Sequence, residues 1–122
     1  MNGKNVFGES LITCSNSPKT GFFRDGCCNT DASDVGEHTV CIVATEEFLE
    51  FSKKADNDLS TPLPEYAFKG VKPGDRWCLC ALRWVEAYKA NRAPKIVLAA
   101  TNETVLKHIS MDVLIQYAHY EK

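Results

Sequence analysis

The sequence lacks most of the features that identify a protein's class directly. It carries 14 Lys and Arg against 16 Asp and Glu, so it has no basic excess of the kind that nucleic-acid-binding proteins use. Its N-terminus has no basic stretch followed by an apolar run, and its longest apolar run, residues 77–82, is much too short to cross a bilayer. We therefore expect a cytoplasmic protein that binds neither nucleic acid nor membrane.

Familiar catalytic motifs are missing as well. The sequence contains no Walker loop, no GxGxxG, no HExxH and no GxSxG. The pattern therefore names no cofactor, no substrate and no partner, and it leaves open whether the protein is an enzyme.

The composition is that of a folded domain. The chain has 122 residues, 44% of them hydrophobic and 25% charged, with a net charge of -2. Such a chain is long enough to bury a core and too ordinary in charge to be disordered throughout. We expect one domain, residues 1–122, that needs no metal or disulfide to fold.

Hydrophobic patterning and capping residues divide the chain into alternating strands and helices. They predict strands over 6–13, 38–45, 76–81 and 95–100, and helices over 46–55, 82–91, 101–108 and 110–118. Turn-forming residues crowd two long connections, 14–37 and 56–74. The order predicts an α+β fold: a single-domain two-layer sandwich with a mixed sheet, helices mainly on one face and two long ordered loops.

Cysteine is the most informative residue type, and it occurs at positions 14, 27, 28, 41, 78 and 80. Without a secretory signal, we expect thiols, a metal site or redox chemistry rather than a disulfide framework. Cys41 and Cys80 lie among apolar residues and are predicted to fill the core. Cys27, Cys28 and Cys78 lie near arginines, which favour the reactive thiolate. The pattern leaves Cys14 without a role.

A metal site is a second interpretation of the same residues. Its ligands would be Cys27, Cys28, Cys78 and Cys80, or three of these thiolates with His38. However, zinc sites normally separate paired cysteines by two to four residues in a turn, whereas this sequence has CC and, on a strand, CxC. We therefore expect no metal, and keep these four cysteines as the alternative.

Histidine, arginine and aspartate supply the other candidates. His38, at the start of a strand, is the candidate base for a cysteine nucleophile, although it also fits a polar strand end. Four charged residues in or beside the long loops are the candidate binding residues: Arg24, Asp25, Asp75 and Arg76. Arginine forks match carboxylates and phosphates, but they also pair with aspartates of the same chain.

Several blocks of the sequence resemble a known bacterial family. They are TGFFRDGCCNT (20–30), GEHTVCIVATEEFLEFSK (36–53), NDLSTPLPEYAFKGVKPGDRWCLCALRWVEAY (57–88) and APKIVLAAT (93–101). In these blocks the chain is similar to the domain of unknown function DUF2237, over about residues 5–118. The resemblance implies a single-domain, two-layer α+β fold in a bacterial-type intracellular protein, and it implies no activity.

The leading hypothesis is a binding domain for a small molecule or a partner. Its two long loops would line one pocket at an end of the sheet, because they hold the chemically distinctive residues. A thiol-dependent enzyme with His38 as base, a cysteine-ligated metal protein, and a purely structural role for all these residues are the alternatives.

Overall fold

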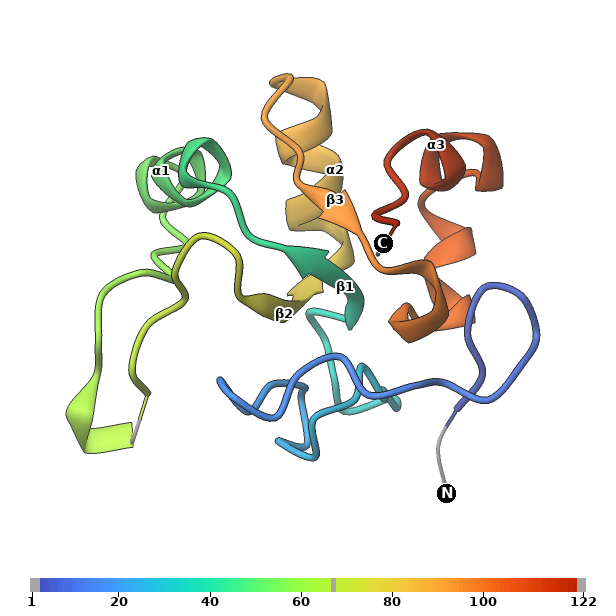
Figure 1. The fold of residues 1–122 in the computed structure, drawn as a ribbon, viewed down its shortest axis with the longest axis horizontal. Coiled ribbons are helices and arrows are strands. Elements are labelled where there is room, and N and C mark those ends of the chain that lie inside the picture. Colours follow the sequence, from blue (N-terminus) through green and yellow to red (C-terminus); the bar gives the residue numbers. More distant parts are fainter. Residues whose placement is uncertain (1–2, 67, 121–122) are drawn as a thin grey trace.

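The computed structural model describes residues 3–66 and 68–120 and shows a small α+β domain, as predicted (Figure 1). Its strands and helices are β1 (His38–Val43), α1 (Glu46–Lys54), β2 (Arg76–Cys80), α2 (Ala81–Lys89), β3 (Lys95–Ile96) and α3 (Met111–Gln116). Short 3-10 helices span Pro64–Tyr66, Leu98–Ala100 and Glu103–Lys107. Within the described residues, no helix has the length and apolar content needed to cross a membrane.

The sheet has the order β2-β1-β3, with β1 in the middle. Both pairings are antiparallel, so the prediction of a mixed sheet is wrong in this detail. The reason is that β1 lies between β2 and β3 and runs opposite to both, so the two strands that run in the same direction, β2 and β3, are not neighbours. A register irregularity near the start of β1 sets His38 opposite Cys80, while Cys41 lies opposite Cys78.

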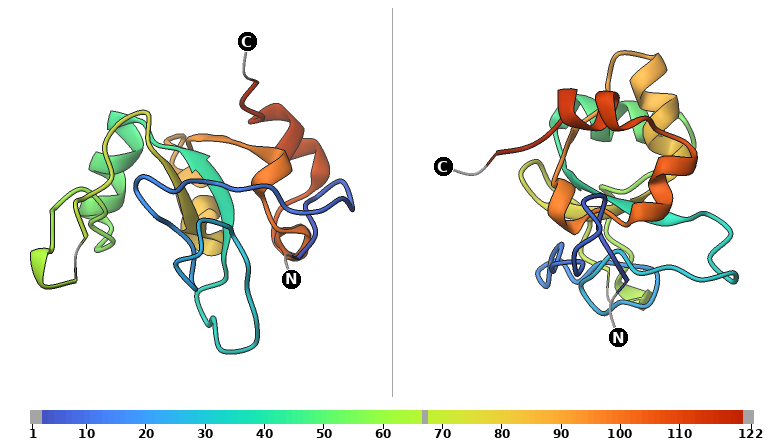
Figure 2. Two further views of the ribbon diagram at one scale, coloured as in Figure 1. Left: turned by 60° about the horizontal axis from the view of Figure 1, so that its bottom comes forward. Right: turned by 90° about the vertical axis from the view of Figure 1, so that its right-hand side faces the viewer.

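The two faces of the sheet are covered by different layers. The helices lie on one side, and residues 3–37, here called the N-terminal segment, lie on the other (Figures 1 and 2). Side chains of a strand alternate between faces. Val40 and Ile42 therefore pack in the core with the helices, whereas Cys41 and Val43 pack with the N-terminal segment. The prediction that helices cover mainly one face is confirmed.

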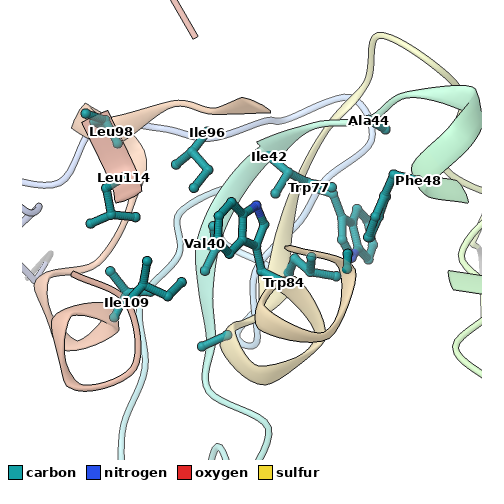
Figure 3. Close-up of a cluster of buried hydrophobic side chains, with 14 of the residues drawn as sticks. Val40, Ile42, Ala44, Phe48, Trp77, Trp84, Ile96, Leu98, Ile109 and Leu114 are labelled. Carbon is teal, nitrogen blue, oxygen red and sulfur yellow. The ribbon is translucent and has the colours of Figure 1, made fainter. Parts of the chain in front are cut away.

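The larger core lies between the sheet and the helices. Trp84 of α2 has no exposed surface and lies among Val40, Ile42 and Ile96 of the sheet (Figure 3). Its indole Nε1 donates to the carbonyl oxygen of Pro94 at 3.1 Å, so the one polar atom of the ring is satisfied in the interior. The helix α2 is thereby anchored both by packing and by a hydrogen bond.

The helices α1 and α3 begin at residues whose side chains cap the first turn. The side chain of Thr45 accepts from the backbone N–H of Phe48, and that of Ser110 accepts from the N–H of Val113. Such bonds satisfy amide groups that a helix leaves unpaired at its first turn. Asn102 caps the turn Glu103–Lys107 in the same way, although that turn is a 3-10 helix.

Two predicted strands are wrong or too long. Residues 6–13 form no strand in the described chain, and their neighbourhood holds only isolated bridges, Lys4 with Ser10 and Asn5 with Asn102. The predicted strand 95–100 ends at Ile96, and its apolar remainder turns into the 3-10 helix Leu98–Ala100. Burial against the sheet, rather than strand pairing, accounts for the apolar character of this remainder.

Candidate functional site

A pocket of about 480 Å³ lies beside β2, one of the two edge strands of the sheet. Both long loops line it, the first through Arg24 and Gly36 and the second through residues 57–59, Leu63 and Phe68. The strands contribute His38, Trp77, Leu79 and Cys80, and α2 adds Arg83. The two loops therefore share one concavity, which is the geometry that the binding hypothesis requires. We call this hollow the edge pocket.

The imidazole of His38 is held in one orientation. Its Nδ1 lies 2.7 Å from Oδ1 of Asp34, whose side chain is fully buried. The other carboxylate oxygen accepts from the backbone N–H of His38 and from the hydroxyl of Thr30, both at 2.9 Å. Because a carboxylate accepts, Nδ1 carries the hydrogen, and Nε2 of the neutral ring is left as an acceptor. Phe22 stacks on the imidazole, with the two ring centroids 6.0 Å apart. The backbone of Gly36 lies so close to the imidazole that a Cβ at this position would come within 2.9 Å of Cε1 of His38.

A free thiol lies directly across the sheet from this histidine. Cys80 is the register partner of His38, is half-buried and forms no disulfide. Residues directly opposite in an antiparallel pair have Cβ atoms about 5 Å apart. Imidazole and thiol thus lie in the same wall of the edge pocket. The prediction that Cys80 fills the core is wrong, because β2 ends at this residue, at the rim of the sheet.

The rest of the pocket wall combines aromatic and cationic groups. The guanidinium of Arg24 lies over the ring of Trp77, 5.3 Å from its centroid, and donates to the carbonyl oxygen of Gly21 at 2.8 Å. Arg24 adopts a φ of 54°, a left-handed conformation that aims this side chain from a tight turn. Phe68, which also lines the pocket, packs on Trp77, with the two ring centroids 5.5 Å apart.

Two carboxylates near the pocket stay ionised. Hydrogen bonds from Thr61 and Ser60 hold the pKa of Asp58 at about 2, below its usual 3.8. Hydrogen bonds from Lys107 and His108 lower the pKa of Glu37, the residue before His38. Asp58 lines the pocket, whereas the Glu37 carboxylate is committed to its two partners at 2.9 Å each. At neutral pH the pocket therefore carries one fixed negative charge beside its two arginines.

Only one of the four predicted binding residues lines the edge pocket. Arg24 lines the edge pocket, but Asp25 closes its own turn by accepting from the backbone N–H of Cys27. Asp75 accepts from the N–H of Lys72, and Arg76 begins β2, at the opposite end from Cys80. The other three residues do not line the edge pocket, so the structure does not bring all four predicted binding residues into this one site.

Four of the six cysteines form disulfides, so the prediction of no disulfide framework is wrong. Cys14 is bonded to Cys41 and Cys28 to Cys78, across 27 and 50 residues. Both bonds join the N-terminal segment to the sheet, where Cys41 and Cys78 are direct neighbours on β1 and β2. In this state Cys28 and Cys78 are not available as nucleophiles.

Cys27 forms no disulfide, but it is buried beside Thr13 and does not line the edge pocket with His38. The predicted metal set is also divided by the fold. Cys28 and Cys78 meet each other, while Cys27 and Cys80 lie outside the buried sulfur group that the structure forms with Cys14.

Sequence reasoning misses one member of the site, Asp34, and gives another, Cys80, a different role. Asp34 lies four residues before His38 in a turn rich in Asp and Ser, where nothing distinguishes it from its neighbours. Cys80 shares the CxC pattern with Cys78, which places both on one face of a strand. Only the register of β1 against β2 brings it opposite His38.

The fold and the site define a small α+β domain with an irregular layer bonded by disulfides to one face of a three-stranded sheet. A family model described as an uncharacterized protein conserved in bacteria matches residues 4–118. The chain belongs to this family, DUF2237, as its sequence resemblance indicated. No curated protein matches the chain.

Proposed function

We propose that the protein binds a small organic anion, a carboxylate with an apolar or aromatic body, in the edge pocket. The observation that carries the proposal is the shared wall: both long loops and β2 enclose one hollow that holds Arg24, Trp77 and His38. Its volume, about 480 Å³, lies within the range of small-molecule sites.

The wall chemistry supports this class of ligand. Phe68 and Leu63 of the second loop offer apolar surface to a ligand, whereas Trp77 and Leu79 form the floor of the pocket with little exposed area of their own. Arg24 is exposed and its forked guanidinium matches a carboxylate, while Arg83 is partly engaged by Glu86 at 3.2 Å. His38 adds an acceptor in its neutral form and a donor when protonated.

Binding is tested with phenylacetate and hexanoate, each beside its uncharged amide. We expect the carboxylates to shift the indole N–H resonance of Trp77, which lines the pocket, and to leave that of Trp84 unchanged. Arg24→Asn, a residue that tolerates positive φ, should weaken binding by about tenfold, because a charge-assisted contact is lost. Arg92→Asn, at an exposed position outside the pocket, is the matched control.

Equal binding of the amides, equal shifts at both indoles, or unchanged affinity in Arg24→Asn would each contradict the proposal. So would the absence of any shift at millimolar concentrations of both carboxylates.

A second candidate function, thiol chemistry, is favoured by the placement of Cys80 opposite His38, whose imidazole Asp34 orients. A thiol, a base and an orienting carboxylate are the three groups that activate a cysteine when the thiol and the base come within hydrogen-bond reach. In a reaction with an electrophile, Nε2 of His38 takes the thiol proton and the sulfur forms a bond to the electrophilic carbon.

Iodoacetamide measures this activation, because the S–C bond forms as the C–I bond breaks and iodide leaves. We expect Cys80 to be alkylated faster than the buried Cys27, and His38→Asn to slow Cys80 by about tenfold or more at neutral pH. Mass spectrometry of the two cysteine peptides gives both rates, with Cys27 as the internal control. If His38→Asn leaves both the alkylation rate of Cys80 and its pH profile unchanged, His38 is excluded as the base of Cys80.

A further inference from the structure

The four disulfide-bonded cysteines form one buried group of sulfur atoms between the sheet and the N-terminal segment. The Sγ atoms of Cys14, Cys28 and Cys78 all lie within 4.8 Å of one another, and that of Cys41 is bonded to Cys14. Each of the four residues is at most 3% exposed. We call this group the sulfur cluster.

The cluster draws one residue from each of four places in the chain. Cys41 and Cys78 project side by side from β1 and β2, because directly opposed residues of an antiparallel pair share a face. Cys14 and Cys28 approach them from the N-terminal segment, with Cα separations of 5.8 Å to Cys41 and 5.4 Å to Cys78. Two donors from the sheet thus face two from the covering layer.

Four sulfurs around one point are the donor set of a tetrahedral metal site. With Zn–S bonds of about 2.3 Å, the edge of the tetrahedron is about 3.8 Å. The Sγ atom of Cys14 already lies within 4.8 Å of those of Cys28 and Cys78, and that of Cys41 is bonded to Cys14. A metal site therefore needs both disulfides to open and the four sulfurs to draw together around one point. Rotation about the Cα–Cβ bonds moves the sulfurs while the strands stay in register.

We propose that the sulfur cluster, once its two disulfides are reduced, binds one zinc ion through the thiolates of Cys14, Cys28, Cys41 and Cys78. Each disulfide takes two electrons and two protons from a dithiol or phosphine reductant, which is oxidised in turn. The four thiols then release four protons as Zn²⁺ binds. The resulting site is closed and buried, and its role is to hold the N-terminal segment on the sheet.

The nature of the donors selects the ion. The group consists of cysteines alone among the residues that the structure describes, and all-thiolate sites favour soft or borderline ions over Ca²⁺ and Mg²⁺. Zinc also fits because it requires no redox change of its own and prefers tetrahedral sulfur ligation. This proposal is independent of the edge pocket, whose thiol, Cys80, lies outside the cluster.

The test is a titration of the full chain with Co²⁺ and then Zn²⁺, after reduction by a phosphine and removal of the reductant under anaerobic conditions. We expect one Co²⁺ per chain with the visible bands of tetrahedral cobalt and a sulfur-to-cobalt charge-transfer band, and displacement by one Zn²⁺. The oxidised chain should bind neither ion. Circular dichroism and thermal unfolding of the reduced chain should show stabilisation by Zn²⁺, or refolding if reduction alone unfolds it.

Two variants separate this cluster from the other thiols. Cys27→Ala/Cys80→Ala keeps all four ligands, and its titration should match that of the natural sequence. Cys14→Ala/Cys41→Ala removes two ligands and should lose the tetrahedral spectrum and weaken Zn²⁺ binding by about 100-fold or more.

Three results would overturn the proposal. They are a reduced chain that neither binds nor is refolded by Zn²⁺, a cobalt spectrum retained by Cys14→Ala/Cys41→Ala, and a spectrum lost in Cys27→Ala/Cys80→Ala.

Discussion

Replacing both Cys28 and Cys78 with alanine is expected to lower the free energy of unfolding of the oxidised protein by about 4 kcal/mol. Their disulfide closes a loop of 50 residues, which contains all of α1 and β1. Cutting it frees the unfolded chain more than the folded one, and chain-entropy arguments give the stated magnitude for a loop of this length. Because small domains are stable by only about 5–15 kcal/mol, the loss is a large share of the total.

Denaturant unfolding without reductant, followed by tryptophan fluorescence, measures this loss. The matched control is Cys27→Ala, which removes a buried sulfur next to Cys28 but no covalent bond. The difference between the two variants isolates the cross-link from the packing of the side chains. If the double variant is less stable than the control by only about 1 kcal/mol or less, the disulfide does not constrain the unfolded chain in this way.

The same experiment bears on the bond between Cys14 and Cys41. The loop of 27 residues that this bond closes overlaps the loop of 50 residues closed by Cys28 and Cys78. The contributions of the two disulfides to stability are therefore not independent. Removing both disulfides should therefore cost more than the sum of the two separate losses, because in each single variant the remaining bond masks part of the effect. This non-additivity is expected because each bond already limits the part of the unfolded chain that the other would close.

Trp84→Ala is expected to destabilise the domain by about 4 kcal/mol. The indole has no exposed surface, stacks on Tyr88 at 5.4 Å and meets the edge of Tyr117 at 5.2 Å. Alanine leaves a cavity in the main core and also removes the donor to the carbonyl oxygen of Pro94. Both effects act in the same direction, because lost contacts and an unpaired buried acceptor each disfavour the folded state.

Urea unfolding followed by circular dichroism measures this change without relying on the fluorescence of Trp84. Trp84→Phe keeps an aromatic ring and loses the hydrogen bond, so it should lie between the natural protein and Trp84→Ala. Tyr120→Ala is the surface control, because Tyr120 is 75% exposed and should change stability by less than about 0.5 kcal/mol. A loss in Trp84→Ala no larger than in that control would show that the helices do not depend on this side chain.

The candidate site shows where sequence reasoning was sufficient and where it failed. His38 and Arg24 were chosen for their chemistry and their place in or beside a long loop, and both line the edge pocket. Asp75 and Arg76 were chosen on the same grounds but belong to the far end of β2. Position in or beside a long loop thus did not show which of the candidate residues line the same pocket.

The cysteines mark the same limit more sharply. Sequence spacing argued against a site built from CC and CxC, and the structure does not build one from those four residues. The cysteines that lie together are instead Cys14, Cys28, Cys41 and Cys78. The strand register places Cys41 beside Cys78, and the fold of the N-terminal segment brings Cys14 and Cys28 against them. Neither register nor the path of an irregular loop is encoded in residue spacing.

The sequence by itself determined the local elements: the capped starts of α1 and α3 at Thr45 and Ser110, and the apolar strands β1 and β2. These depend on residues only a few positions apart, whose propensities and hydrogen bonds act within one element. Tertiary structure alone decided that β3 ends at Ile96, that Cys80 faces His38, and that four distant cysteines meet. Those outcomes depend on contacts between segments tens of residues apart, where packing and strand register decide the neighbours.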